Sequence, residues 1–148
     1  MGDQKPDPMD VPTVLEHLNR ALVFQQRSVL QFTMGAGSMF GLEYQAVGSE
    51  LWLFARAELE DTKLLVEKIT ALGGEPTVEV GALRWSSQPA EAVDALIESE
   101  DETIAALHAV IPHTGQEPRS EALEHLMEHL IMRKQNQVDW LRRARRAP

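Results

Sequence analysis

Polar and charged side chains interrupt four otherwise apolar helical stripes of this chain. Each stripe is found by stepping alternately three and four residues, a spacing that keeps side chains on one face of a helix. Carboxylates can coordinate a hard metal ion or neutralise a buried ammonium group, so these interruptions are the first candidates for chemistry. In chain order the interrupting residues are Gln25, Glu58 and Thr62, Glu100, and Lys134 and Gln137. Gln25, Glu58, Glu100 and Lys134 fall near the middle of separate stripes, so a bundle would bring them together in its core.

Start and stop signals define the helices that must position these residues. Asp10 is expected to cap the first helix, with Pro12 in its first turn. Ser49 is expected to cap the second helix after a connection over residues 41–48, and Gly73 and Gly74 to end it. Pro112 is expected to stop the third helix. The predicted helices span about 11–40, 49–72, 90–111 and 120–146.

The connection over residues 75–88 is the longest one. A long crossover is needed between parallel neighbouring helices, whereas antiparallel neighbours need only a short turn. The pattern therefore predicts an all-α, single-domain four-helix bundle over residues 11–148, with a long crossover between the second and third helices. Residues 1–10 are expected to form a flexible lead-in.

Composition limits the function classes. The chain has 148 residues, a formal charge of −9 and no cysteine. The negative charge argues against a nucleic-acid partner, which requires basic surface. No apolar run is long enough to span a bilayer, and the N-terminus lacks the features of a secretory signal, so we expect no membrane partner and a cytoplasmic location.

Several short segments resemble the bacterioferritin branch of the ferritin-like superfamily in their order and spacing. They are Leu18-Asn19, Gln31-Phe32, Glu58 followed three residues later by Asp61, the stretch LLVEKITALGGEP from Leu64 to Pro76, and Val138-Asp139-Trp140-Leu141. The resemblance covers nearly the whole chain. It implies that the bundle is ferritin-like, and it implies oligomerisation as a dimer or a larger assembly.

The family builds a di-iron centre from one Glu on each of the first and third helices and a Glu-x-x-His motif on each of the second and fourth. The resemblance implies that Glu58 and Glu100 are retained, while four ligands are replaced, by Gln25, Asp61, Lys134 and Gln137. Leu59 follows Glu58 where the family's haem-binding Met would stand, so no haem is expected.

The substitutions lead to a hypothesis about Lys134. Its ammonium would replace iron as the counter-ion of the buried carboxylates, with Gln25 and Gln137 completing the hydrogen bonds. Two alternatives stay open: Lys134 extends outward to solvent, leaving a polar patch, or Glu58, Asp61 and Glu100 keep a reduced metal site.

Two functions therefore remain. The first is a ferritin-like protein with a degenerate di-iron centre and no resident cofactor, acting as a non-catalytic structural, interaction or mixed-assembly subunit linked to iron handling. Its partners would be copies of itself or an active ferritin-like protein. The alternative is an iron-binding storage protein or ferroxidase that uses the reduced carboxylate site.

The segment from His125 to His129 also fits the H-x-x-E-H pattern of inverted zinc peptidases. Five-residue matches arise by chance, no convincing third ligand follows, and the chain is far shorter than such enzymes. His125 and His129 are one helical turn apart, so surface metal binding by this pair is the remaining prediction.

Overall fold

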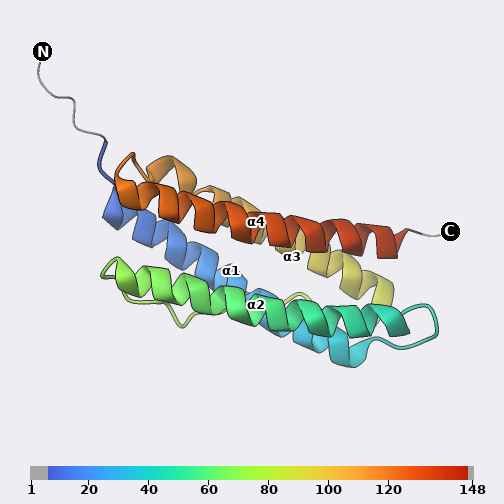
Figure 1. The fold of residues 1–148 in the computed structure, drawn as a ribbon. Helices are drawn as coiled ribbons and strands as arrows, with labels where there is room; N and C mark the ends of the chain where they lie inside the picture. The colour runs from blue at the N-terminus through green and yellow to red at the C-terminus, as the bar shows by residue number, and fades with distance from the viewer. Residues whose placement is uncertain (1–6, 147–148) are drawn as a thin grey trace, which may run out of the picture.

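The computed structural model of the protein describes residues 7–146, and within them it contains helices and no strand. The helices are α1 (Val11–Ser38), α2 (Gln45–Ala71), α3 (Pro89–His108) and α4 (Pro118–Arg145), with a short 3₁₀ helix, η1 (Ile111–His113), between the last two. The four long helices lie side by side as a bundle (Figure 1). The predicted fold class is confirmed. None of the helices in this range is long and apolar enough to cross a membrane.

The N-terminal start of α1 follows the sequence signals. The side chain of Asp10 accepts hydrogen bonds from the Thr13 backbone N–H at 3.3 Å and from the Thr13 hydroxyl at 2.8 Å. This satisfies one of the unpaired N–H groups at the helix start. Residues 1–6 of the expected lead-in lie outside the described range, whereas residues 7–10 hydrogen-bond to the α3–α4 connection: Gln116 N donates to Asp7 O at 2.7 Å.

The predicted start of the second helix is wrong. α2 begins at Gln45, four residues before Ser49, because Gly41 at a φ of 86° turns the chain early. Gly48 is helical and faces α1: a Cβ there would lie 3.2 Å from Met39 Cβ and 3.3 Å from Ala36 O. This glycine therefore permits close approach of two helices and does not belong to the connection.

The end of the third helix also differs from the prediction. α3 ends at His108, and the chain then tightens into i→i−3 hydrogen bonds, such as Val110 N to Leu107 O at 3.2 Å. Pro112 lies inside η1 and has no backbone N–H, so it cannot form the α-helical hydrogen bond to the His108 carbonyl. The helix therefore ends before Pro112 is reached.

The crossover over residues 75–88 runs along α1, as Figure 1 shows for the loop after α2. Its backbone hydrogen-bonds to α1 at three levels: Thr77 N to Asn19 Oδ1 at 2.8 Å, Gly81 N to Val23 O at 3.1 Å, and Arg84 N to Gln31 Oε1 at 2.7 Å. These bonds fix a segment that has no regular structure of its own.

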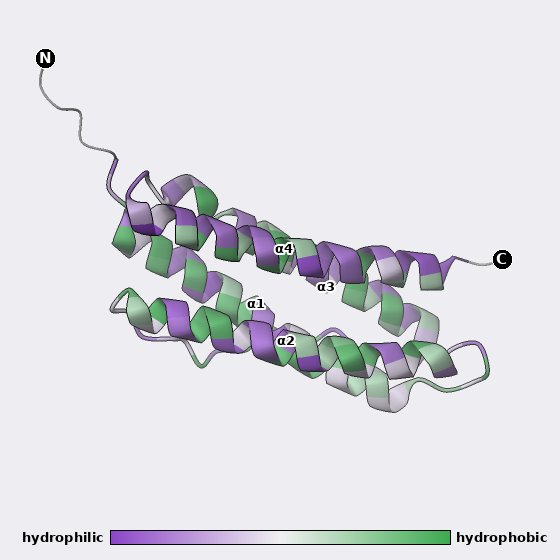
Figure 2. Ribbon diagram, in the orientation of Figure 1, coloured by the Kyte–Doolittle hydropathy of each residue, from purple (hydrophilic) through white to green (hydrophobic). Residues whose placement is uncertain are grey.

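The apolar core consists of two clusters, and the buried polar residues of the stripes lie between them. Figure 2 shows hydrophilic and hydrophobic residues alternating along each of the four long helices. One cluster contains Leu18, Leu22, Leu65, Leu107, Met127 and Leu130, and the other contains Phe32, Leu51, Ala55, Val93 and Leu141. Along α1, Gln25 lies between Leu22 of the first cluster and Phe32 of the second. The helices therefore present a buried polar layer in the middle of the bundle.

Candidate functional site

Lys134 lies at the centre of this polar layer. Its side chain is 0% exposed, and its Nζ lies 2.5 Å from Glu58 Oε2 and 3.0 Å from Glu100 Oε2. The lysine comes from α4 and the two carboxylates come from α2 and α3. The alternative in which Lys134 extends to solvent is therefore wrong, since the ammonium donates hydrogen bonds to two buried carboxylates.

Residues of α1 and α2 donate further hydrogen bonds to Glu58 and Glu100. Gln25 Nε2 donates to Glu58 Oε2 at 2.5 Å and to the Glu58 backbone carbonyl at 3.1 Å. Ser28 Oγ donates to Glu100 Oε1 at 2.5 Å. Thr62 Oγ1 donates to the Glu58 carbonyl, one turn back along α2, at 2.8 Å. Each of the four helices thus contributes at least one side chain to the layer.

Asp61 is buried beside this network but has a different counter-ion. It pairs with Arg133 of α4, whose side chain is partly exposed, and makes no hydrogen bond to Lys134. The sequence reasoning did not identify Arg133, although it directly precedes Lys134. α4 therefore supplies two adjacent cations, one to Glu58 and Glu100 and the other to Asp61.

Gln137 does not have the predicted role. It is buried, but within residues 7–146 its Oε1 has no hydrogen-bond partner, and the residue donates to neither Glu58 nor Glu100. Gln25 Oε1, Glu58 Oε1 and Asp61 Oδ2 are likewise buried without a partner in this part of the chain. All four atoms are acceptors, and one donor beside Asp61, Arg133 Nε, is buried without a partner among these residues as well.

Burial dominates the electrostatics of the layer. It raises the pKa of Glu100 to about 7, helped by the nearby Glu58 carboxylate and opposed by Lys134 and Ser28. It also raises the pKa of Asp61, against the opposing effect of Arg133. For Lys134, burial works to lower the pKa, but Glu100 and Glu58 outweigh it and hold that pKa above its ordinary value. Lys134 is therefore a permanent cation at neutral pH.

The structure also locates the other residues singled out from the sequence. His125 and His129 are both exposed on α4. Among residues 7–146, no group of three or more His, Asp or Glu side chains is arranged to hold a metal ion. Metal binding by the histidine pair alone stays a prediction, and so does a metal role for Glu58, Asp61 and Glu100.

Comparisons with known proteins agree with this architecture. The model of the ferritin family, described as a ferritin-like domain, matches residues 15–146. The chain is also similar to a crystal structure of ferritin-like, diiron-carboxylate proteins from Bacillus anthracis str. Ames, with a TM-score of 0.86 and 23% sequence identity. That match covers 93% of this chain and 98% of the other. No curated protein matches the sequence.

Proposed function

The chain belongs to the ferritin family, and we propose that it is a member whose di-iron centre has been replaced by an internal ion-pair network. In this proposal the protein is a non-catalytic structural or interaction subunit linked to iron handling, assembling with copies of itself or with an active ferritin-like protein. The observation that supports it is the ammonium of Lys134, fully buried between Glu58 and Glu100.

The residues of the polar layer do not fit a di-iron centre. A protonated lysine has no lone pair to offer a metal, and Lys134 already holds one oxygen of each of Glu58 and Glu100. Gln25 carries no charge where the family has a Glu, so it cannot offset the charge of iron, and the amide of Gln137 is a poorer ligand for iron than the imidazole of the family's His. Lys134 instead supplies positive charge that balances the carboxylates. We therefore propose no ferroxidase step for this chain.

The competing function is iron binding by Glu58, Asp61 and Glu100, and a metal count separates the two. Purified protein is loaded with ferrous iron without oxygen and dialysed, and its metal content is measured beside that of Glu58→Gln. We expect equal iron in both, because Glu58 is held by Lys134 and Gln25. Iron that is retained by the wild type and lost in Glu58→Gln would contradict the proposal. Glu67→Gln, which changes an exposed carboxylate of α2, is the matched control.

A second variant tests the role of Lys134 in the same measurement. Lys134→Glu exchanges the central cation for a fourth carboxylate beside Glu58, Asp61 and Glu100. Divalent metals bind oxygen ligands more tightly when negative charge accumulates around them. We expect this variant to retain at least about tenfold more ferrous iron than the wild type. An unchanged content in a folded variant would mean that Lys134 is not what excludes metal.

Self-association is supported by apolar side chains exposed on α1 and α2. Trp52 and Leu59, two turns apart on one face of α2, are 50% and 59% exposed, and Leu30 and Met34 form an exposed pair one turn apart on α1. Large apolar side chains gathered on a surface are typical of interaction sites. We propose that these helices contact a second copy of the chain.

Replacing one of these residues by a charged one is expected to weaken the assembly. Leu59→Glu would bury an unpaired carboxylate in the contact, which should raise the dissociation constant by roughly thirtyfold or more. Light scattering coupled to size-exclusion chromatography measures the mass over a range of concentrations. Met132→Glu is the control, because Met132 is 53% exposed but lies on α4. If Leu59→Glu and Met132→Glu changed the dissociation constant equally, the contact would not be the proposed surface of α1 and α2.

A further inference from the structure

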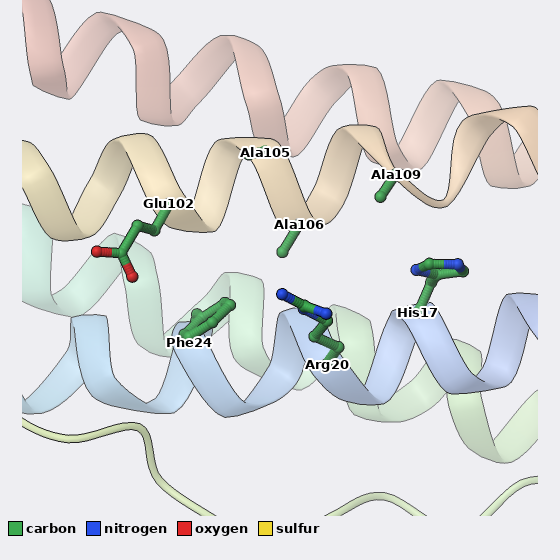
Figure 3. Close-up of a pocket in the computed structure, with 7 residues that line it drawn as sticks. All are labelled: His17, Arg20, Phe24, Glu102, Ala105, Ala106 and Ala109. Atoms are coloured by element: carbon green, nitrogen blue, oxygen red, sulfur yellow. The ribbon is translucent and has the colours of Figure 1, made fainter.

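A cavity of about 390 Å³ lies between α1 and α3, lined by residues that take no part in the polar layer. Its walls are His17, Arg20 and Phe24 from α1, Glu102, Ala105 and Ala106 from α3, and Ala109 directly after α3 (Figure 3). The α1 residues are three and four positions apart, and Glu102, Ala106 and Ala109 follow the same spacing with Ala105 beside them, so two stripes face each other across the cavity. The alanine methyls leave the space open, and its volume is within the range of small-molecule pockets.

Arg20 is an exposed arginine in the wall of this cavity. It forms no ion pair and no side-chain hydrogen bond with any residue from 7 to 146. Figure 3 shows its guanidinium directed from α1 toward α3, between Phe24 and His17. An unpaired guanidinium presents a planar fork of donors that matches the two oxygens of a carboxylate.

The acidic residue of the cavity is already neutralised. Both terminal nitrogens of Arg27 lie 3.4 Å from Glu102 Oε2, and Arg84 of the crossover pairs with Glu102 Oε1. Arg27 is anchored further by donating to Ser99 O at 3.1 Å. Two cations therefore face one carboxylate beside the cavity, and Arg20 adds a third, although the whole chain carries a charge of −9.

Two aromatic rings on either side of Arg20 are held in position by their neighbours. The Arg27 guanidinium lies over the Phe24 ring at 4.7 Å from its centroid. The His17 ring stacks on His113 of η1, with centroids 4.9 Å apart and an angle of 7° between planes. Rings fixed in this way can pack against a flat ligand with little loss of side-chain entropy.

We propose that this cavity binds a small aryl carboxylate. Arg20 would hold the carboxylate through paired hydrogen bonds, while the ring of the ligand would lie on the α3 side of the guanidinium, against the methyl groups of Ala105 and Ala106 and beside the Phe24 ring. This site is separate from the polar layer, so a test of it is independent of the proposed loss of the di-iron centre.

Titration of the full chain with benzoate, followed by ¹H–¹⁵N correlation spectra, tests this site. Benzoate is expected to shift amide signals of α1 and α3 around the cavity. Benzamide, which keeps the ring but lacks the charge, and acetate, which keeps the charge but lacks the ring, should each bind at least about tenfold more weakly.

Two variants connect binding to the cavity. Arg20→Gln should weaken benzoate binding at least about tenfold. Ala105→Leu fills the space from an exposed position of α3 with a good helix former and should remove the shifts. Arg56→Gln makes the same charge change on an exposed position of α2 and should leave binding unchanged. The spectra themselves report whether each variant is folded.

Several results would overturn the site. They are the absence of shifts at benzoate concentrations on the order of 10 mM, equal binding of benzoate and benzamide, unchanged binding in folded Arg20→Gln, or shifts centred away from α1 and α3. Equal weakening by Arg20→Gln and Arg56→Gln would indicate attraction by overall charge only, and would also reject the site.

Discussion

Replacing Lys134 with methionine is expected to lower the free energy of unfolding by about 3–5 kcal/mol at pH 7.5. Methionine keeps most of the length of the side chain but removes the ammonium that lies between Glu58 and Glu100. Two carboxylates would then remain in the core with Gln25 and Ser28 as their side-chain donors. Urea unfolding followed by circular dichroism, analysed with a common slope, measures the difference.

Controls separate the loss of charge from the loss of a side chain. Lys63→Met removes a lysine whose pairing with Glu67 is exposed on α2, and it should change stability by at most about 0.5 kcal/mol. The double variant Glu58→Gln/Lys134→Met should regain part of the stability that Lys134→Met loses. Removing the Glu58 carboxylate leaves one buried negative charge fewer without its cation. If Lys134→Met is as stable as the wild type, the ammonium is not the counter-ion of the core.

The same network explains why a buried charge cluster can persist without being a source of net stability. Taking an ammonium and two carboxylates out of water costs several kcal/mol per ion, and their mutual attraction offsets this only when hydrogen bonding is complete. Here Glu58 Oε1 has no partner among residues 7–146. We therefore expect Glu58→Gln, Glu100→Gln and Lys134→Met combined to be far less damaging than Lys134→Met alone.

Helical periodicity accounts for the parts of the layer that the sequence predicted. The stripes identified the buried faces, because a side chain on the core side of a helix is buried whatever its polarity. This is why Gln25, Glu58, Glu100 and Lys134 were expected together, and all four are buried in the structure. Hydrogen bonds between them depend on rotamers and helix rotation, which periodicity does not define, so the expectation for Gln25 was met and that for Gln137 was not.

Residues just beside the stripes were missed for a related reason. Ser28 lies three positions after Gln25 on α1, and Arg133 lies one position before Lys134 on α4. Both reach the layer from its edge, with side chains that are common on helix surfaces. A search for donors three or four positions from each polar interruption would have found Ser28, whereas Arg133 is recognised only once α2 and α4 are placed together.

The start of α2 was predicted too late because glycine has two different uses in helical proteins. A glycine can end a helix, or it can let two helices approach, and the sequence alone does not distinguish these uses. Gly41 takes the first role, with its positive φ, while Gly48 takes the second against Met39 and Ala36. The predicted connection treated them alike and therefore extended too far.

The charge of the polar layer makes the free energy of unfolding depend on pH. Glu58, Asp61 and Glu100 face two cations, Lys134 and Arg133, so full ionisation leaves one excess negative charge. Burial raises the pKa of Glu100 from 4.5 to about 7. Between these values the folded protein holds a proton that the unfolded chain has released, so stability falls as the pH rises through this interval.

The size of this effect follows from the difference between the folded and unfolded pKa of Glu100, which corresponds to about 3 kcal/mol lost between pH 4.5 and pH values above 7. Asp61 contributes with the same sign, since burial raises its pKa as well.

Unfolding free energies measured at intervals from pH 5 to 8 should therefore decline in the wild type. Glu100→Gln removes the titrating group and keeps one acceptor oxygen, so one of the two hydrogen bonds that Ser28 and Lys134 donate to Glu100 is retained. The decline of this variant should be smaller by about 2–3 kcal/mol. Glu98→Gln, which changes an exposed carboxylate two positions before Glu100 on α3, should follow the wild type. Parallel profiles for wild type and Glu100→Gln would mean that Glu100 remains ionised in the folded protein and that the layer keeps one excess negative charge.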